Sequence, residues 1–540
     1  MWKYRAMQQT DLADLVQDAS RQAPDRLAVV ESGGRGRTWL ELEHEVASVA
    51  SGLSKLGILA GHRVMIVVAN RLEFVTAYLG VLRAQVVAVP VNPRSTADDL
   101  ARMIADSGTR LVIADPGALP AVRTACAQVA AALAGEPTDL EDDLIGRAQR
   151  PRVVVIDEPP ADGEVSYAGL VATVARAIPP LPDPEKLAAL LYTSGTSGRP
   201  RAAMLTHRAL LANLDQVGKV EPPLIHGDDV VLGVLPLFHV YGLNAVLGGV
   251  LKYRAKLLLV EQWDPVGVLD LIEDEAVSVV PITPPVFAQW RGLDDLADRF
   301  GPVRLILSGS APLSRQVVEE FTALTSVPIH QGYGMTEASP VVTSTLCSVS
   351  LQPGSAGTAL PGIEIRLVDE SGTATTGEDP GQIQIKGDNL FSGYWPDGAG
   401  GPSTEGWWST GDVGFLDPLG DLFLVDRVRE LIIVSGFSVY PSEVEDVIRE
   451  VPGVSGAAVI GVEDAESGEV VVAYVVSSAD GGDHDDLVDE VRRHCAIRLA
   501  RFKQPTRIEV VDRLPLTVTG KVQKGRLRGI ERRRALGLLE

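Results

Sequence analysis

Cysteine is scarce in this chain, which has three cysteines, Cys126, Cys347 and Cys495, in 540 residues and no CxxC pair. So sparse and odd a set argues against a disulfide framework and fits no zinc-type spacing. The N-terminal residues also lack the apolar stretch of a secretory signal. We therefore expect a reducing compartment, and the cytoplasm is the expected location.

Long hydrophobic runs are also missing. The longest ones are interrupted by charges, by Glu73 and Arg83 in one and by Lys252 and Arg254 in another. None reaches the roughly 20 apolar residues that a helix needs to cross a bilayer.

Positive charge is in deficit, because 49 Lys and Arg face 71 Asp and Glu, for a formal charge of −22. Such a chain is a poor candidate for nucleic-acid binding, which depends on neutralising phosphates. The basic stretch from Lys521 to Arg534 is expected to be a solvated helix face and allows at most peripheral membrane contact.

The length exceeds what one hydrophobic core usually supports, so at least two domains are expected. Short apolar runs read as buried strands and alternate with helical patterns such as 71–84 and 240–251, which favours α/β architecture with largely parallel sheets. The runs are 62–68, 86–90, 110–114, 152–156, 187–193, 230–236, 256–260 and 303–309.

The texture changes after about residue 350, where segments become shorter and richer in Gly. This predicts a β-rich subdomain, followed from 421–427 by a compact tail with strands at 470–478 and 506–512 and a helix at 485–499. We predict an N-terminal domain at 1–425, a hinge at 426–430 and a C-terminal domain at 431–540.

The strongest local motif is LLYTSGTSGRPRAAMLTH at 190–207, in which a buried strand runs into a Gly- and hydroxyl-rich loop and a helix begins near Thr206. Backbone N–H groups, hydroxyls and the charges of Arg199 and Arg201 would cradle phosphates. The GxxxxGK[ST] spacing of a P-loop is absent.

TSGTSGRPR resembles the phosphate loop of the adenylate-forming superfamily, and further motifs follow in that family's order over nearly the whole chain. They are LPLFHVYGL (235–243), LSGSAPLS (307–314), QGYGMTEASP (331–340), GSAGTALPGIEIRLVD (354–369), GWWSTGDVGFLD (406–417), DRVRELIIVSGFSVYPSEVE (426–445) and LPLTVTGKVQKGRLR (514–528). The wording is most similar to the fatty acyl-CoA synthetase branch.

The resemblance implies an α/β fold with a large N-terminal domain of two parallel-type α/β subdomains plus a β-rich subdomain, and a small mobile α+β C-terminal domain. It also implies ATP, Mg²⁺ and coenzyme A, with a fatty acid activated as acyl-AMP, pyrophosphate released and the acyl group passed to the thiol.

The resemblance gives roles to single residues. Glu337 would hold the metal, Tyr333 would stack on adenine, Asp412 with Arg427 would take the ribose hydroxyls, and Lys521 would enter the site during adenylation. The implied catalytic residues are Lys521, Glu337, Thr193 and His239. The implied ATP-binding residues are Thr193, Ser194, Gly195, Thr196, Ser197, Gly198, Arg201, Gly309, Ser310, Ala311, Gln331, Gly332, Tyr333, Gly334, Thr336, Asp412 and Arg427.

For the second half-reaction, the family rotates its C-terminal domain about a hinge residue, here Arg429. Ser435, Gly436 and Phe437 would then border the coenzyme A tunnel. One departure concerns the phosphate loop, which usually ends in Pro-Lys-Gly and here reads Pro200-Arg201-Ala202. A planar guanidinium is not a point charge, and alanine resists positive φ, so pyrophosphate handling is expected to differ.

The acid pocket is expected around 239–244, 282–287 and 330–334, stretches that are mostly apolar or small. An apolar acyl chain fits best, and an aryl acid is the main alternative. Two other functions are an acyl-AMP ligase that loads an acyl carrier protein and a regulatory ATP-binding protein without activity. The chain length of the acid and a homodimer are left open.

Overall fold

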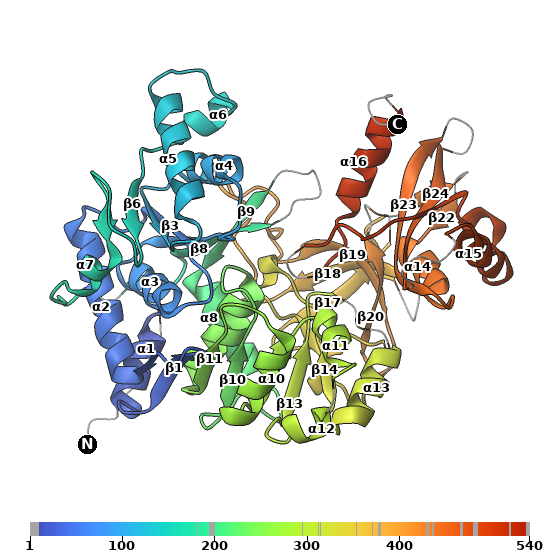
Figure 1. The fold of residues 1–540 in the computed structure, drawn as a ribbon, viewed down its shortest axis with the longest axis horizontal. Coiled ribbons are helices and arrows are strands. Elements are labelled where there is room, and N and C mark those ends of the chain that lie inside the picture. The colour runs from blue at the N-terminus through green and yellow to red at the C-terminus, as the bar shows by residue number, and fades with distance from the viewer. Residues whose placement is uncertain are drawn as a thin grey trace.

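The computed structural model describes residues 10–179, 181–193, 200–293, 295–311, 313, 315–352, 354–369, 371–375, 380–427, 430, 432–434, 437–464, 468–478, 484–517 and 520–535. Figure 1 shows the chain running from a blue N-terminal part of helices and strands to a red C-terminal domain. No helix in these ranges is long and apolar enough to span a membrane.

The first body is a seven-stranded sheet with mostly parallel neighbours. In spatial order its strands are β7 (Val165–Ser166), β6 (Arg152–Val155), β5 (Leu111–Ala114), β3 (Arg63–Val67), β4 (Val87–Pro90), β8 (Leu187–Thr193) and β9 (Arg201–Thr206). Its helices are α1 (Asp14–Gln22), α2 (Trp39–Lys55), α3 (Leu72–Arg83), α4 (Ala97–Ser107), α5 (Leu119–Leu133), α6 (Asp142–Ile145) and α7 (Tyr167–Val171).

The second body is a seven-stranded sheet of the same kind. Its strand order is β14 (Ile329–Gln331), β13 (Leu305–Ser308), β12 (Val279–Ile282), β10 (Val230–Gly233), β11 (Lys256–Leu259), β1 (Leu27–Glu31) and β2 (Gly36–Thr38). Its helices are α8 (His207–Val217), the π-helix η1 (Tyr241–Gly248), α9 (Gly249–Tyr253), α10 (Pro265–Asp274), α11 (Pro284–Trp290), α12 (Leu296–Arg299) and α13 (Arg315–Thr325).

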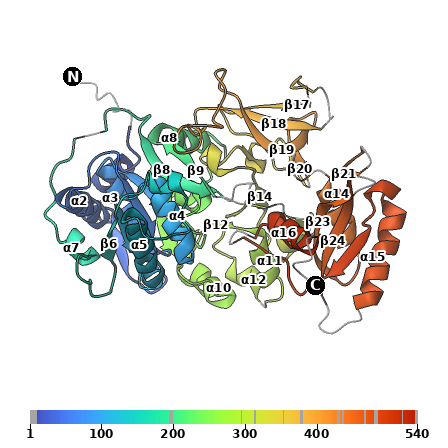
Figure 2. The ribbon, with the colours of Figure 1, turned by 90° about the horizontal axis from the view of Figure 1, so that it is seen from above.

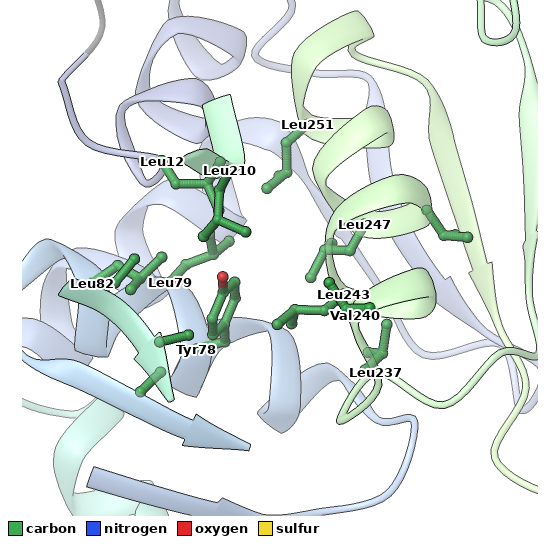
Figure 3. Packing of buried hydrophobic residues seen from close by; sticks show 14 of the residues in the cluster. Leu12, Tyr78, Leu79, Leu82, Leu210, Leu237, Val240, Leu243, Leu247 and Leu251 are labelled. Atoms are coloured by element: carbon green, nitrogen blue, oxygen red, sulfur yellow. The ribbon is translucent and has the colours of Figure 1, made fainter. Parts of the chain in front are cut away.

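The two large sheets are joined by one apolar core, in which α3 is buried on almost every face, from Leu72 to Leu82. A helix that is apolar all round belongs inside a protein. Figure 3 shows Tyr78 of α3 with its hydroxyl end toward Leu210 of α8, and with Leu243 of η1 to one side of its ring. This shared core fixes how the carboxyl ends of both sheets meet.

The β-rich subdomain is an antiparallel four-stranded sheet, preceded by a small ribbon and two single turns. The sheet contains β17 (Glu364–Val368), β18 (Gly381–Lys386), β19 (Trp408–Leu416) and β20 (Leu422–Arg427). The ribbon contains β15 (Thr343–Ser344) and β16 (Thr358–Ala359), and the turns are η2 (Thr336–Ala338) and η3 (Thr345–Cys347).

The C-terminal domain is a five-stranded sheet with helices, seen at one end of the molecule in Figure 2. Its elements are β21 (Ile432–Val434), β22 (Phe437–Val439), α14 (Pro441–Arg449), β23 (Val454–Asp464), β24 (Gly468–Ser477), α15 (His484–Arg498), η4 (Arg501–Lys503), β25 (Arg507–Val510) and α16 (Lys524–Ala535). The predicted fold class is thus confirmed, whereas the exact limits of the domains and the hinge stay predictions.

The helix expected near Thr206 is present, since α8 begins at His207 with Thr206 as its N-cap. The strand β9, which returns antiparallel to β8 before that helix, was not expected. One expectation needs correction. The basic C-terminal helix is not wholly solvated, since Lys524 lies 2.9 Å from Glu445 and Arg534 lies 2.6 Å from Glu509.

Candidate active site

A cavity of about 760 Å³ opens where the two large sheets meet the β-rich subdomain and the C-terminal domain. Strand β8 ends at Thr193, β13 at Ser308 and β14 at Gln331, and all three residues line it. Parallel α/β sheets bind ligands beyond the carboxyl ends of their strands. The alternation of strands and helices thus brings motifs far apart in sequence to one place.

One side of the cavity suits a nucleoside. Tyr333 is 8% exposed as a residue, and its hydroxyl donates a hydrogen bond to Asp412 Oδ2 at 2.6 Å. A Cβ on Gly332 would lie 2.7 Å from a backbone oxygen, and one on Gly334 2.2 Å from another, so larger residues would displace this loop. An aromatic face beside a hydroxyl-accepting carboxylate is what a base with its ribose requires.

Most other predicted nucleotide-site residues lie on the same wall. Those that line the cavity are Gly309, Ser310, Gln331, Gly332, Gly334 and Thr336, whereas Ala311 lies outside the lining. Ser310 has φ +75°, an unusual value for a serine, at the turn that follows β13.

The phosphate side of the cavity contains Thr193, Arg201 and the carboxylate of Glu337, which is 9% exposed as a residue. Tyr394 donates from its hydroxyl to Glu337 Oε1 at 2.6 Å. Within the described ranges, no three His, Cys, Asp or Glu side chains converge on a complete metal site. A Mg²⁺ ion held by one carboxylate and by phosphate oxygens fits this arrangement, because such ions keep few protein ligands.

The replacement of the family's usual Lys-Gly is accommodated locally. Ala202 lies in β9, 1% exposed, and its carbonyl accepts from Trp395 N at 2.9 Å. Its conformation is an ordinary strand that alanine adopts without strain. Of the two replacements, Arg201 for lysine and Ala202 for glycine, only the guanidinium of Arg201 is therefore expected to change the site.

Some predicted residues cannot be placed. Those outside the described residues are Ser194, Gly195, Thr196, Ser197, Gly198, Arg429, Ser435 and Gly436. For Arg427 and Phe437 the strands β20 and β22 give the backbone only, and Arg427 pairs opposite Asp412 in the sheet. Their assigned roles stay predictions.

The C-terminal domain completes the cavity with a tight turn. Lys521 N donates to Thr517 Oγ1 at 3.0 Å, and both residues line the cavity. Gly520 has φ +82°, and a Cβ there would lie 2.5 Å from Pro285 Cγ of α11. Only glycine allows this approach, which places Lys521 beside the N-terminal domain.

His239 is a neutral imidazole at pH 7. Burial, and then the nearby charge of Lys521, lower its pKa to about 4. The backbone N–H of Tyr241 points at Nδ1 from 3.4 Å, so Nε2 carries the proton in this arrangement. His239 can thus donate a hydrogen bond without adding charge.

This depressed pKa predicts a loss of stability in acid. At pH above 6.5 His239 is neutral in both states; as the pH falls from 6.5 toward 4 only the unfolded chain gains its proton, at a cost approaching ~3 kcal/mol. His239→Gln should therefore lose less stability than the parent over this window, measured as unfolding free energy against pH. His44→Gln, at an exposed position, is the control and should follow the parent. If the unfolding free energy of His239→Gln falls with pH as steeply as that of the parent, the assignment is contradicted.

The remaining part of the cavity is apolar. Its lining includes Leu191, Val217, Leu224, Ile225, Val231, Phe238, Val240, Tyr241, Ala245, Val246, Pro281, Leu307 and Val341. The expected segment 282–287 does not line it; Phe287 instead packs edge-on against Phe321 at 5.0 Å, behind the wall. The segments 239–241 and 330–334 do line it, and Asn244 is buried with Nδ2 bonded to Leu210 O and Ser339 O.

Several lining residues were missed in the sequence, namely Gln382, Tyr394, Trp408 and Thr517. Tyr394 lies in the sequence Gly-Tyr-Trp between Gly-rich turns. The pair of aromatic residues was the feature of the sequence that could have marked this segment as part of the site. Thr517 lies four residues before Lys521 within a motif that was recognised.

Family comparisons agree with this site. The model of the AMP-binding enzymes matches residues 16–395, and that of the AMP-binding enzyme C-terminal domain matches 443–521. A 4-coumarate–CoA ligase of Oryza sativa subsp. japonica is 32% identical, over 96% of this chain and 94% of its own length. The resemblance recognised from the motifs is confirmed.

Solved structures are also similar to this chain over almost its whole length. ATP-bound MatB from Rhodopseudomonas palustris is 31% identical with a TM-score of 0.83, covering 96% of this chain and 98% of its own. Its apo form gives a TM-score of 0.74. A Mycobacterium tuberculosis fatty acyl CoA synthetase is 27% identical with a TM-score of 0.73, covering 96% and 98% of the two chains.

Proposed function

This chain belongs to the family of AMP-binding enzymes, and from that premise we propose that its acid substrate is an apolar monocarboxylic acid. The enzyme is an ATP-dependent acid–CoA ligase that works through an acyl adenylate. One observation carries the choice of acid: the apolar wall of the cavity adjoins the wall that contains His239, Glu337 and Lys521.

In the first half-reaction the acid's carboxylate attacks the α-phosphorus of ATP, and pyrophosphate leaves. Both reactants are anions, so positive charge must offset their repulsion and the charge that develops. Lys521 supplies an ammonium and Arg201 a guanidinium, while neutral His239 donates from Nε2 to the acid oxygen. Tyr333 and Asp412 hold the nucleoside in place.

Glu337 would hold Mg²⁺, which when bound neutralises phosphate charge. Among the residues without described placement, we assign Ser194 to Gly198 to the phosphates. Arg427 is assigned to the ribose, together with Asp412.

In the second half-reaction the coenzyme A thiol attacks the acyl carbonyl and AMP leaves. We assign the hinge to 426–430, around Arg429, with 1–425 and 431–540 as the two domains. Rotation would withdraw Lys521 and bring Ser435, Gly436 and Phe437 to the thiol's path. Swapping catalytic parts in this way protects a reactive intermediate from water.

Medium- or long-chain fatty acids are the first candidate class. The described part of the apolar wall presents no Lys, Arg, Asp or Glu that could pair with a second charged group on the acid. Burying such a group without a partner costs several kcal/mol. An apolar wall therefore favours acids with one carboxylate and a hydrocarbon body.

An arylpropenoic acid is the second candidate, favoured by the 32% identity to a 4-coumarate–CoA ligase. A flat aromatic body would also pack against Val240, Pro281 and Leu307. Fatty acids and arylpropenoic acids differ in length and width. A panel of acids that covers both classes can therefore show which one the cavity accepts.

The test is a panel of acids from acetate to palmitate, with cinnamate, 4-coumarate and malonate, each with and without coenzyme A. Release of AMP and the product mass are measured. An apolar acid should exceed malonate by at least about 100-fold in kcat/KM, as expected for one uncompensated buried charge. A preference for malonate would overturn the proposal, and adenylate without thioester would point to an acyl carrier protein as acceptor.

A further inference from the structure

Tyr394 lies between the two charged side chains of the phosphate side of the cavity. The guanidinium carbon of Arg201 is 3.6 Å from the centroid of its ring, and its hydroxyl donates to Glu337 Oε1 at 2.6 Å. One tyrosine thus contacts a cation with its face and a carboxylate with its hydroxyl. Both charged groups line the cavity.

The backbone holds this tyrosine firmly. Tyr394 bridges Ala203 of β9, and the next residue, Trp395, donates from its N–H to Ala202 O at 2.9 Å. The segment therefore extends the sheet edge beside the very strand that begins with Arg201. Arg201 begins β9, and Tyr394 lies in a segment that bridges this strand, so the backbone already holds ring and guanidinium side by side.

The surroundings are shaped for the stack. Phe391 packs edge-on against the Tyr394 ring at 5.0 Å. A Cβ at Gly400 would lie 3.3 Å from that ring and 3.4 Å from Arg201 Nη2, closer than most neighbours tolerate. On the other side, Glu337 is fixed by its carbonyl, which accepts from Phe391 N at 2.9 Å.

We propose that Tyr394 is a positioning residue for adenylation: its hydroxyl orients Glu337 for the metal, and its ring face orients Arg201 for the pyrophosphate. A planar guanidinium stacks on an aromatic face and offers two parallel donors to a phosphate, which an ammonium does not. The stack therefore gives a reason for arginine where the family usually has lysine. This inference rests on the proposed function, since it assigns phosphates and metal to this wall.

The two contacts can be separated by substitution. Tyr394→Phe removes the hydroxyl and keeps the ring, Tyr394→Leu removes both, and Arg201→Lys removes the stack and keeps the hydroxyl. Two affinities are measured without any acid. One is Mn²⁺ binding to enzyme saturated with α,β-methylene-ATP, by electron paramagnetic resonance, and the other is pyrophosphate binding, by calorimetry.

Tyr394→Phe should weaken Mn²⁺ binding about 10-fold and leave pyrophosphate affinity within about twofold, since partners of metal ligands contribute such factors. Arg201→Lys should weaken pyrophosphate about fivefold and leave Mn²⁺ unchanged. Tyr394→Leu should weaken both. Tyr253→Phe, which removes a tyrosine hydroxyl away from the cavity, should change neither.

Unchanged Mn²⁺ binding in Tyr394→Phe, or equal losses of both affinities in Tyr394→Phe and Arg201→Lys, would overturn the inference. Should Tyr394→Leu fail to fold, the other two variants still decide. A parent enzyme that does not bind the ATP analogue would contradict the proposed function instead, whereas an unexpected acid in the panel would leave this test intact.

Discussion

Lys521→Ala is expected to slow acyl-adenylate formation by about 100- to 1,000-fold, the usual cost of removing one preorganised charge from a transition state. The turn of Gly520 is docked against Pro285, so the ammonium is already at the cavity before the acid binds. Thioester formation from supplied acyl adenylate should keep most of its rate. Both half-reactions are followed separately, by pyrophosphate exchange and by thioester appearance.

Arg526→Ala is a matched control, because Arg526 is an exposed cation of the same domain, five residues away. It should leave both half-reactions within about twofold. An equal loss of adenylation and of thioester formation in Lys521→Ala would contradict a lysine that acts in the first step alone.

Trp290→Ala is expected to cost about 3–5 kcal/mol of local stability, the usual range for removing a fully buried tryptophan. Trp290 is 0% exposed and packs edge-on against Phe300 at 5.4 Å, and Phe321 contacts both of these rings. Its Nε1 donates to Pro265 O at 2.9 Å, and that carbonyl would lose its partner as well. Because α11 also contains Pro285, this cluster anchors the surface on which the C-terminal turn docks.

The measurement is native-state hydrogen exchange at the amides of β12 and β13, since a multidomain chain need not unfold in one step. The exposed Leu324, on the same helix as Phe321, gives the control Leu324→Ala, expected to change the opening free energy by less than about 0.5 kcal/mol. A shift below about 1 kcal/mol in Trp290→Ala would show that the aromatic cluster does not hold this wall.

Local patterns predicted the strands well. The apolar run 187–193 coincides with β8, and 485–499 differs from α15 by one residue at each end. Strands β1 and β9 were not predicted. Val29 of β1 pairs with Leu257, which lies far away in the sequence. Strand β9 forms a hairpin with its neighbour β8, in which Leu191 pairs with Ala203, but only a helix was expected after the loop that joins them.

Site residues within recognised motifs were predictable, and those defined by tertiary contact were not. Tyr333 and Asp412 lie 79 positions apart, and the motifs placed both at the nucleoside, although their mutual hydrogen bond was unforeseen. The segment 282–287 was misplaced because an apolar run at a strand end can face the cavity or the core, and Phe287 faces the core. The role of Tyr394 depends on Glu337, 57 positions earlier.

The hydrogen bond from Tyr333 to Asp412 bears on how easily the enzyme exchanges its nucleotide. In the proposed function, the ribose hydroxyls would bond to this same carboxylate, which accepts from the phenol of Tyr333 in the structure. An incoming ribose would therefore replace the hydrogen bond from the Tyr333 hydroxyl. Its binding would gain only the difference in free energy between the two hydrogen bonds. On departure of AMP, the hydroxyl of Tyr333 could donate to Asp412 again, which would offset part of the free energy lost with the ribose.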